Sequence, residues 1–162
     1  MSRGGTIFHG IGSVTDRAKK RLLNDHYLKR LPPMSHTFEW HHGQQFGPQA
    51  IATFGVPASR HMQKGAWPEN PNGVLELNRL WIEDEEPKGT ASWFLASCLK
   101  QMPPFLILSY ADTKAGHDGT VYRAANFKYA GWTDMDRKTP RFDYVVPDGH
   151  SRDAFRKGDG TN

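Results

Sequence analysis

The stretch that decides the fold begins at Val74 and reads VLELNRLWI up to Ile82. Apolar and polar residues alternate along it, which is the period-two pattern of a β-strand. The alternation predicts that Leu75, Leu77 and Trp81 lie on one side of the strand. A strand has to pair with others, so the chain is predicted to be built around a sheet.

The residues after this strand predict a turn, a helix and a second strand. Glu83–Pro87 is an acidic turn, and Thr90–Met102 carries a broad apolar face at helical spacing. Pro103 and Pro104 end the helix. Phe105–Ser109 is a continuous apolar run, which is typical of a central strand covered on both faces. This order predicts an α/β (α+β) fold, a single domain with a central mixed β-sheet flanked by helices.

The same reading extends in both directions along the chain. Residues 1–12 are expected to be a flexible lead-in, residues 13–147 the domain and residues 148–162 a polar tail. Prolines and glycines predict a long surface loop over residues 57–73. The other expected elements are a helix over Val14–Leu31, strands over Thr37–His41 and Ala50–Val56, a short helix over Thr120–Asn126, and closing strands over Phe127–Trp132 and Phe142–Val146.

The composition of the 162 residues places limits on the class of protein. Hydrophobic residues make up 37% of the chain and the mean hydropathy is −0.68. Aromatic residues make up 12%, and a content this high argues against disorder. No apolar run approaches the ~18 residues that a membrane span needs, and no signal peptide is recognisable. The one cysteine, Cys98, cannot form a disulfide within the chain and lies in the apolar face of a predicted helix. We expect a cytoplasmic protein with no membrane partner.

Positive charge gathers at the start of the chain. The net charge is +4, yet residues 1–30 alone hold seven basic residues against two acidic ones. Four of the seven lie together on the predicted first helix: Arg17, Lys19, Lys20 and Arg21. A basic block attracts phosphate, so these residues favour double-stranded DNA as a partner. The alternative is a helix face that is charged only because it is solvated.

Polar residues directly follow the run Phe105–Ser109, where ligand sites of α/β sheets gather. Asp112 can act as a base, a metal ligand or a hydrogen-bond acceptor, and His117 can move a proton or bind a metal. His26, Asp112 and His117 together have the composition of a two-histidine, one-carboxylate iron site. Alternatively, Asp112 and Asp118 only cap the next helix.

The turn before the predicted second helix can bind an anion. Free N–H groups at a helix start attract phosphate, and Gly89 allows close approach. Four carboxylates at residues 83–86 oppose a pyrophosphate by repulsion, and an ordinary helix cap is the alternative. The candidate cofactor-binding residues are Lys88, Gly89, Thr90, Ala91 and Ser92, with Ser109 at the end of the next strand.

Two resemblances follow from these pieces. The order of elements over residues 74–132 is shared by the GNAT fold of acyl-CoA N-acetyltransferases, and Gly89 and Ala91 agree with the acetyl-CoA loop of those enzymes. Over residues 24–132 the chain also resembles the Mom family of phage DNA-modification proteins. The segments that carry this second resemblance are His26-Tyr27, Phe54–Ser59, Glu76–Leu80, Ser92, Ser109–Asp112 and Gly116–Phe127.

The resemblance to the Mom family implies a transferase on a GNAT-like fold. Such an enzyme converts adenine in phage DNA to N6-(carbamoylmethyl)adenine, which protects the DNA from restriction in the cytoplasm of the host. The resemblance suggests acetyl-CoA or another glycinamide-type molecule as the donor. An iron requirement has been proposed for the family, so Fe(II) is a further candidate cofactor, and a homodimer stays open. The functional set that the resemblance implies is His26, Tyr27, Arg79, Ser92, Asp112 and Tyr122.

The chain departs from the family pattern in two places. Asn78 stands where members tend to have Ser, and Gly89–Ser92 stands where they tend to have Asn-x-Glu-Ser. Two other functions therefore stay open. One is a GNAT acetyltransferase that uses acetyl-CoA on a small amine or a protein, and the other is a non-catalytic DNA-binding protein of the same fold.

The chemistry of adenine assigns expected roles to the site residues. The N6 amine is a poor nucleophile, so an enzyme has to position it and take its proton, which Asp112 or His26 could do. Arg79 could hold a carboxamide or phosphate oxygen, or form an ion pair with Glu76 or with the acidic turn. Tyr122 could donate a hydrogen bond to a developing oxyanion. A duplex adenine has to leave the stack to be reached.

Overall fold

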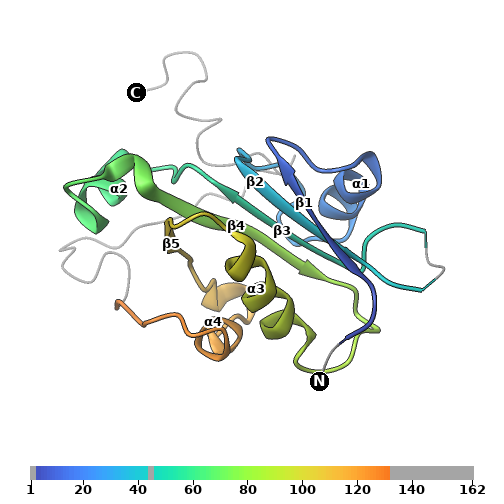
Figure 1. Ribbon diagram of the computed structural model, residues 1–162. Coiled ribbons are helices and arrows are strands. Elements are labelled where there is room, and N and C mark those ends of the chain that lie inside the picture. The colour runs from blue at the N-terminus through green and yellow to red at the C-terminus, as the bar shows by residue number, and fades with distance from the viewer. Residues whose placement is uncertain (1–2, 44–45, 132–162) are drawn as a thin grey trace, which may run out of the picture. The chain divides into compact units, whose positions relative to one another are not determined.

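The computed structural model describes residues 3–43 and 46–131 (Figure 1). Residues 1–128 group as one compact unit, and the residues from Tyr129 onward group separately. The unit is built on a sheet in which the first four strands pair antiparallel and the fifth runs parallel to the fourth. The strands lie in sequence order: β1 (Thr6–Ile11), β2 (His36–His41), β3 (Ala50–Gly55), β4 (Val74–Ile82) and β5 (Leu106–Leu108).

Helices cover both faces of this sheet (Figure 1). Helix α1 (Asp16–Asn24) packs Ala18 and Leu22 against one face, and α3 (Thr90–Gln101) packs Phe94, Leu95 and Cys98 against the other. The mixed sheet with helices confirms the predicted fold class. The shorter elements are α2 (Arg60–Ala66), η1 (Pro71–Gly73), η2 (Thr113–Ala115) and α4 (Thr120–Ala124).

The prediction of the central strand is wrong. All six residues of β3 are buried, and β3 is the middle strand of the sheet. The apolar run Phe105–Ser109 instead yields β5, which pairs only with β4 within the described residues and leaves Leu106 39% exposed. The run is apolar because Phe105 and Ile107 pack on the α3 face. Local apolarity does not reveal how many neighbours a strand has.

A β-bulge overturns the predicted alternation of β4. The register shifts between Thr53 and Phe54, so that Thr53 pairs with Arg79 and Phe54 pairs with Leu77. Asn78 is the extra residue, and beyond it the two faces of the strand exchange. Leu75 and Leu77 therefore face α3, whereas Trp81 packs with Ile51 against α1.

The predicted first helix is too long. Thr15 caps α1 through its hydroxyl, which accepts the N–H of Ala18 (3.3 Å), and the helix ends at Asn24 rather than Leu31. The N–H of Leu28 donates to Nδ1 of His26 (3.0 Å), a local side-chain bond that replaces helical bonding. Residues 25–33 are therefore an irregular segment, which we call the His26 loop.

Three further expectations differ from the structure. Part of the lead-in, Thr6–Ile11, is a strand that pairs along its whole length with β2. The loop over residues 57–73 contains α2 and η1, and residues 127–131 of the expected strand Phe127–Trp132 are irregular. Strand Phe142–Val146 and the tail 148–162 lie outside the described residues.

The second half of the chain follows its pattern more closely. Helix α3 begins at the predicted Thr90, and Met102 is its C-cap. Cys98 is fully buried in its apolar face, and burial raises the pKa of the thiol. Among the described residues, no helix combines the length and apolarity that crossing a membrane requires.

Candidate active site

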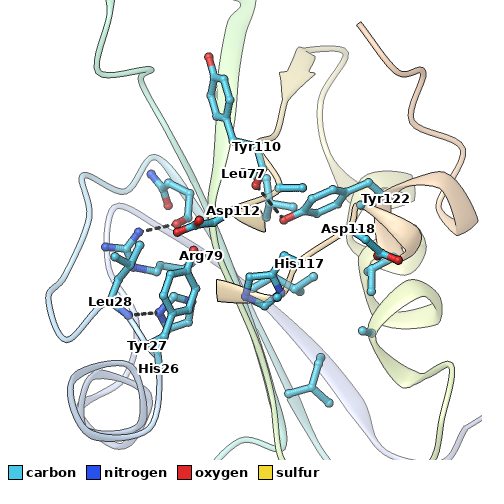
Figure 2. A pocket seen from close by; sticks show the side chains of 18 of the residues that line it. His26, Tyr27, Leu28, Leu77, Arg79, Tyr110, Asp112, His117, Asp118 and Tyr122 are labelled. Carbon is cyan, nitrogen blue, oxygen red and sulfur yellow. Dashed lines mark hydrogen bonds between the residues drawn. The ribbon is translucent and has the colours of Figure 1, made fainter. Parts of the chain in front are cut away.

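The site lies where β4 and β5 separate. Their parallel pairing covers only Val74–Glu76 and Leu106–Leu108, so the rest of β4 has no strand on that side within the described residues. A cavity of about 490 Å³ opens beside this part of β4 (Figure 2). A volume of this size is typical of small-molecule sites.

Both faces of the sheet contribute to the cavity. Figure 2 shows His26 and Tyr27 on one side of β4 and Tyr122 on the other. The His26 loop supplies the first group, and the segment from Tyr110 to Tyr122 supplies the second. Leu77, Leu80 and Ile82 of β4 form the apolar floor on the α3 side.

The structure brings the predicted catalytic residues together around this one cavity. His26, Tyr27, Arg79, Asp112 and Tyr122 all line it, and so does His117. Of the candidate cofactor residues, only Ala91 lines it. Sequence reasoning did not single out Arg30, Glu76 or Tyr110 as site residues, although they also line the cavity. Their short distance in sequence from His26, Arg79 and Asp112 was the available signal.

His26 is a neutral hydrogen-bond donor in this arrangement. Burial, together with the charge of Arg79, lowers its pKa from 6.5 to about 4. The N–H of Leu28 occupies Nδ1 (3.0 Å), so the single proton of the neutral ring is on Nε2. Nε2 can therefore donate, but it cannot accept a proton from a substrate.

Tyr27 forms an aromatic surface at the cavity. Its ring stacks on His26, with centroids 4.6 Å apart, and contacts the ring of His117 at 5.2 Å. The side chain is 48% exposed, although burial of part of it raises the pKa of the phenol. A ring that is held in place by one stacked neighbour and still half exposed can stack against a planar ligand.

The β4 bulge positions Arg79 and fastens the His26 loop. Nη1 of Arg79 donates to the carbonyl of Asn78 (2.5 Å) and Nη2 donates to the carbonyl of Arg30 (3.3 Å). Asn78 donates to the carbonyl of Pro33 (2.8 Å) and accepts the hydroxyl of Thr53 (2.5 Å).

The guanidinium of Arg79 has unused hydrogen-bonding capacity. Arg79 is 5% exposed, its Nε has no partner, and no carboxylate forms an ion pair with it among the described residues. A buried unpaired donor is costly, so it favours a ligand oxygen. The expected alternative, an ion pair with Glu76, does not form.

Two further groups raise the polarity of the cavity. Burial raises the pKa of the Glu76 carboxyl, although the nearby Arg79 opposes this effect. Burial also raises the pKa of the Tyr110 phenol, and the charge of Glu76 adds to it. The Glu76 carboxyl and the Tyr110 phenol are therefore both partly shielded from water, at the point where β4 and β5 separate.

The loop after β5 arranges Asp112, His117 and Tyr122. The carbonyl of Asp112 accepts the N–H of His117 (3.0 Å), and the hydroxyl of Tyr122 donates to the carbonyl of Tyr110 (3.4 Å). Asp118 accepts the N–H of Thr120 (2.9 Å), and this bond lowers the pKa of its carboxyl. Asp118 thus bonds to the first turn of α4. Oδ1 of Asp112 accepts the N–H of Ala115 in η2 (3.4 Å), and Asp112 is also exposed at the cavity.

The turn before α3 retains the features of an anion site. Gly89 has a φ of 86°, a conformation that favours glycine, and the N–H groups of Ala91 and Ser92 have no acceptor in the described part of the chain. The Ser92 hydroxyl donates back to the carbonyl of Gly89 (3.2 Å). Lys88, Thr90 and Ser109 lie outside the cavity lining, and the buried Oγ of Ser109 has no hydrogen-bond partner among the residues that the structure describes.

The acidic turn at residues 83–86 should repel a bound anion less than its sequence suggests. Glu86 accepts Nε2 of His42 (2.6 Å), and its side chain is 8% exposed. Glu83 pairs with Arg21 (2.9 Å). Two of the four carboxylates therefore have hydrogen-bonding or ion-pair partners of their own.

The four basic residues of α1 are engaged to different degrees. Arg21 pairs with Asp25 and Glu83 and stacks over Trp81, while Lys19 pairs with Asp16. Arg17 stacks over Phe46. Lys20 is exposed and has no partner among the described residues. Helix α1 keeps a basic surface, but less of its charge is free than the sequence predicts.

The candidate iron ligands do not form a metal centre in this arrangement. Among residues 3–43 and 46–131, no three His, Cys, Asp or Glu side chains are placed to hold a metal ion together. Nδ1 of His26 already accepts a hydrogen bond, and the Tyr27 ring contacts both histidine rings. The residues present therefore do not fit iron, and the roles proposed below are those of the side chains alone.

The fold and the cavity define an α/β protein with a cavity at the carboxyl ends of its parallel strand pair, the place where such folds bind ligands. The chain belongs to the Mom protein family, because the model of that family matches residues 11–155. It is also similar to the methylcarbamoylase Mom of Escherichia phage Mu, with 34% identity over 64 residues. That match covers 36% of this chain and 27% of the phage Mu protein.

Proposed function

We propose that this chain is a phage DNA-modification enzyme that attaches a carbamoylmethyl group to N6 of adenine. The observation that carries the proposal is the gathering of His26, Tyr27, Arg79, Asp112 and Tyr122 around one cavity in a member of the Mom family. The name of the phage Mu relative, a methylcarbamoylase, supports the nature of the group transferred.

The two sides of the cavity suit two different substrates. The open ring of Tyr27 suits a planar base, and the His26 loop follows the basic helix α1, so we assign this side to the flipped adenine. The α3 side has an apolar floor and includes Ala91, next to the free N–H groups of the helix start, so we assign it to the donor.

Asp112 is the proposed base. It lines the cavity and is exposed to it, whereas His26 carries its proton on Nε2 and cannot accept another in the neutral arrangement. As the N6–carbon bond forms, the leaving group of the donor departs with its bonding electrons, and the N6 proton passes to Asp112. Arg79 and Tyr122 hold the oxygen of the carboxamide through hydrogen bonds.

Nucleoside mass spectrometry tests this function. The chain is expressed in a bacterial host, and its plasmid DNA is digested and compared for wild type, Asp112→Asn and Glu69→Gln. Wild type and Glu69→Gln, an exposed carboxylate outside the cavity, should give a deoxyadenosine adduct of carbamoylmethyl mass. Asp112→Asn should reduce the adduct by roughly 10²- to 10⁴-fold, the usual contribution of a positioned base.

Other outcomes contradict separate parts of the proposal. Unmodified DNA from cells that contain folded wild-type protein would overturn the function. A different mass on adenine would overturn the carbamoylmethyl assignment and keep the enzyme class. Full modification by Asp112→Asn would remove Asp112 from the role of base.

A further inference from the structure

A flipped nucleotide brings its phosphates to the mouth of the site. A base that leaves the duplex stack stays bonded, through its sugar, to the two phosphates on either side. When the adenine enters the cavity, as the proposed function requires, these phosphates come to rest at the rim. A cation that contacts them therefore has to lie at the rim, and not only along α1.

Arg30 is the cation at this position. Two arginines line the cavity, and Arg79 is buried whereas Arg30 is exposed. The side chain of Arg30 forms no hydrogen bond or ion pair with any described residue, and its charge acts on the nearby Arg79. The carboxylates of the lining, Glu76, Asp112 and Asp118, repel phosphate, so the rim attracts phosphate at Arg30.

The backbone beneath Arg30 is held in place. Its carbonyl accepts Nη2 of Arg79 (3.3 Å), and three residues further on the carbonyl of Pro33 accepts the amide of Asn78 (2.8 Å). Gly55 allows this approach, because a Cβ at that position would overlap the Pro33 carbonyl. A cation on a fastened loop loses less conformational freedom on binding than one on a mobile segment.

We propose that Arg30 binds a backbone phosphate next to the target adenine and so sets the register of the DNA over the cavity. The proposal rests on the proposed function, because it assumes that the ligand of the cavity is a flipped base. It adds a DNA-contacting residue that lies beyond the basic block of α1.

Binding of purified full-length protein to duplex DNA tests the contact. The probe is a short fluorescent duplex with one adenine in its labelled strand, followed by anisotropy across a salt series. Arg30→Ala should weaken binding by about tenfold, the usual range for a hydrogen bond to a charged group. It should also lower the slope of log affinity against log salt by ~0.9, the loss of one phosphate contact.

Matched variants separate this contact from general charge. Arg60→Ala removes the same side chain from an exposed position on α2, outside the cavity lining, and should bind as wild type does. Arg30→Lys should keep most of the salt slope. A duplex with a neutral methylphosphonate beside the adenine should weaken binding by wild type and leave Arg30→Ala unaffected.

The outcomes are decisive for the contact itself. Equal affinity and equal salt slope for Arg30→Ala and Arg60→Ala would overturn it. Unchanged affinity of wild type for duplexes with a methylphosphonate at either flanking position would overturn it as well. Melting temperatures show whether Arg30→Ala folds, and the methylphosphonate series on wild type needs no variant. Failure of the proposed function appears separately, as unmodified plasmid DNA in the nucleoside assay.

Discussion

At the scale of single residues, the site depends on protonation states that cannot be read from the residue types. His26 is one of eight histidines in the chain, and nothing in the sequence says that its imidazole is neutral. The structure supplies the reasons, which are burial and the charge of Arg79, while the N–H of Leu28 on Nδ1 fixes which ring nitrogen carries the proton. These together change His26 from a candidate base into a hydrogen-bond donor.

The lowered pKa of His26 predicts a loss of stability in acid. The unfolded imidazole takes up its proton near pH 6.5 and the folded one near pH 4. Between these values the unfolded state binds more protons, so the free energy of unfolding falls as the pH falls from 6.5 to 4, and the loss is complete below that. We expect His26 to contribute about 3 kcal/mol to this loss.

Urea denaturation at pH 7 and pH 4.5 measures this contribution. His26→Asn keeps an acceptor for the Leu28 N–H but has no proton to take up, so it should lose less stability than wild type between the two values. The same loss in both proteins would show that His26 does not resist protonation.

At the scale of elements, the feature that most shapes the site is the bulge in β4. Thr53 opposes both Asn78 and Arg79, and these two side chains hold the His26 loop against the sheet. The bulge thus does two things, because it turns Arg79 toward the cavity and fixes the loop that carries His26, Tyr27 and Arg30.

The close approach of this loop predicts a large effect at Gly55. The β-carbon of Gly55→Ala would overlap the backbone of Pro33, so one of two backbones has to move, which should destabilise the protein by about 2 kcal/mol. Gly65→Ala is the control, since a β-carbon there meets nothing within 4 Å on helix α2, and it should stabilise by roughly 0.5–1 kcal/mol.

Thermal unfolding of both variants measures the difference. The melting temperature should fall for Gly55→Ala and rise slightly for Gly65→Ala. An unchanged melting temperature for Gly55→Ala would mean that the His26 loop does not sit against β3.

The elements also show what the sequence could predict. The bounds of β4 and α3 were predicted closely, although not the faces of β4, because apolar runs and flanking prolines are local signals. The centre of the sheet was misplaced because β3 reads AIATFG, with small residues whose burial comes from neighbours on both sides. The bulge and the end of α1 depend on pairing register and on a side-chain bond of His26, which no periodicity records.

The site was predicted in part for a related reason. Asp112 was predicted from its place after an apolar run, whereas Arg79 and Tyr122 came from a family resemblance, and the fold brings these residues to one cavity. The sequence did not point to Arg30, Glu76 and Tyr110. They line the cavity only because folding brings the His26 loop next to β4 and the end of β5.

At the scale of the whole molecule, the charge of the chain bears on the proposed binding of DNA. The chain carries a net charge of +4, and acidic groups engage part of the basic block of α1. The surface that remains is basic enough to attract a duplex but depends on few free cations.

This balance predicts a moderate dependence of DNA affinity on salt. Log affinity of wild type for duplex DNA should fall linearly with log salt, by ~0.9 for each phosphate contacted. Anisotropy over a salt series measures the slope, and the same series with single-stranded DNA should give ~0.7 for each contact. An affinity that does not change with salt would contradict phosphate contacts altogether.

Cys98, the one cysteine of the sequence, lies on the buried face of α3 in the apolar core, and burial raises the pKa of its thiol. Thiolate chemistry needs exposure and ionisation, so this group is inert toward thiol reagents in the folded protein. The natural chain is therefore a ready background for site-directed cross-linking. A thiol introduced at the rim by Arg30→Cys would be the only reactive one, and a disulfide to DNA tethered at a single backbone position would map the path of the strand one nucleotide at a time.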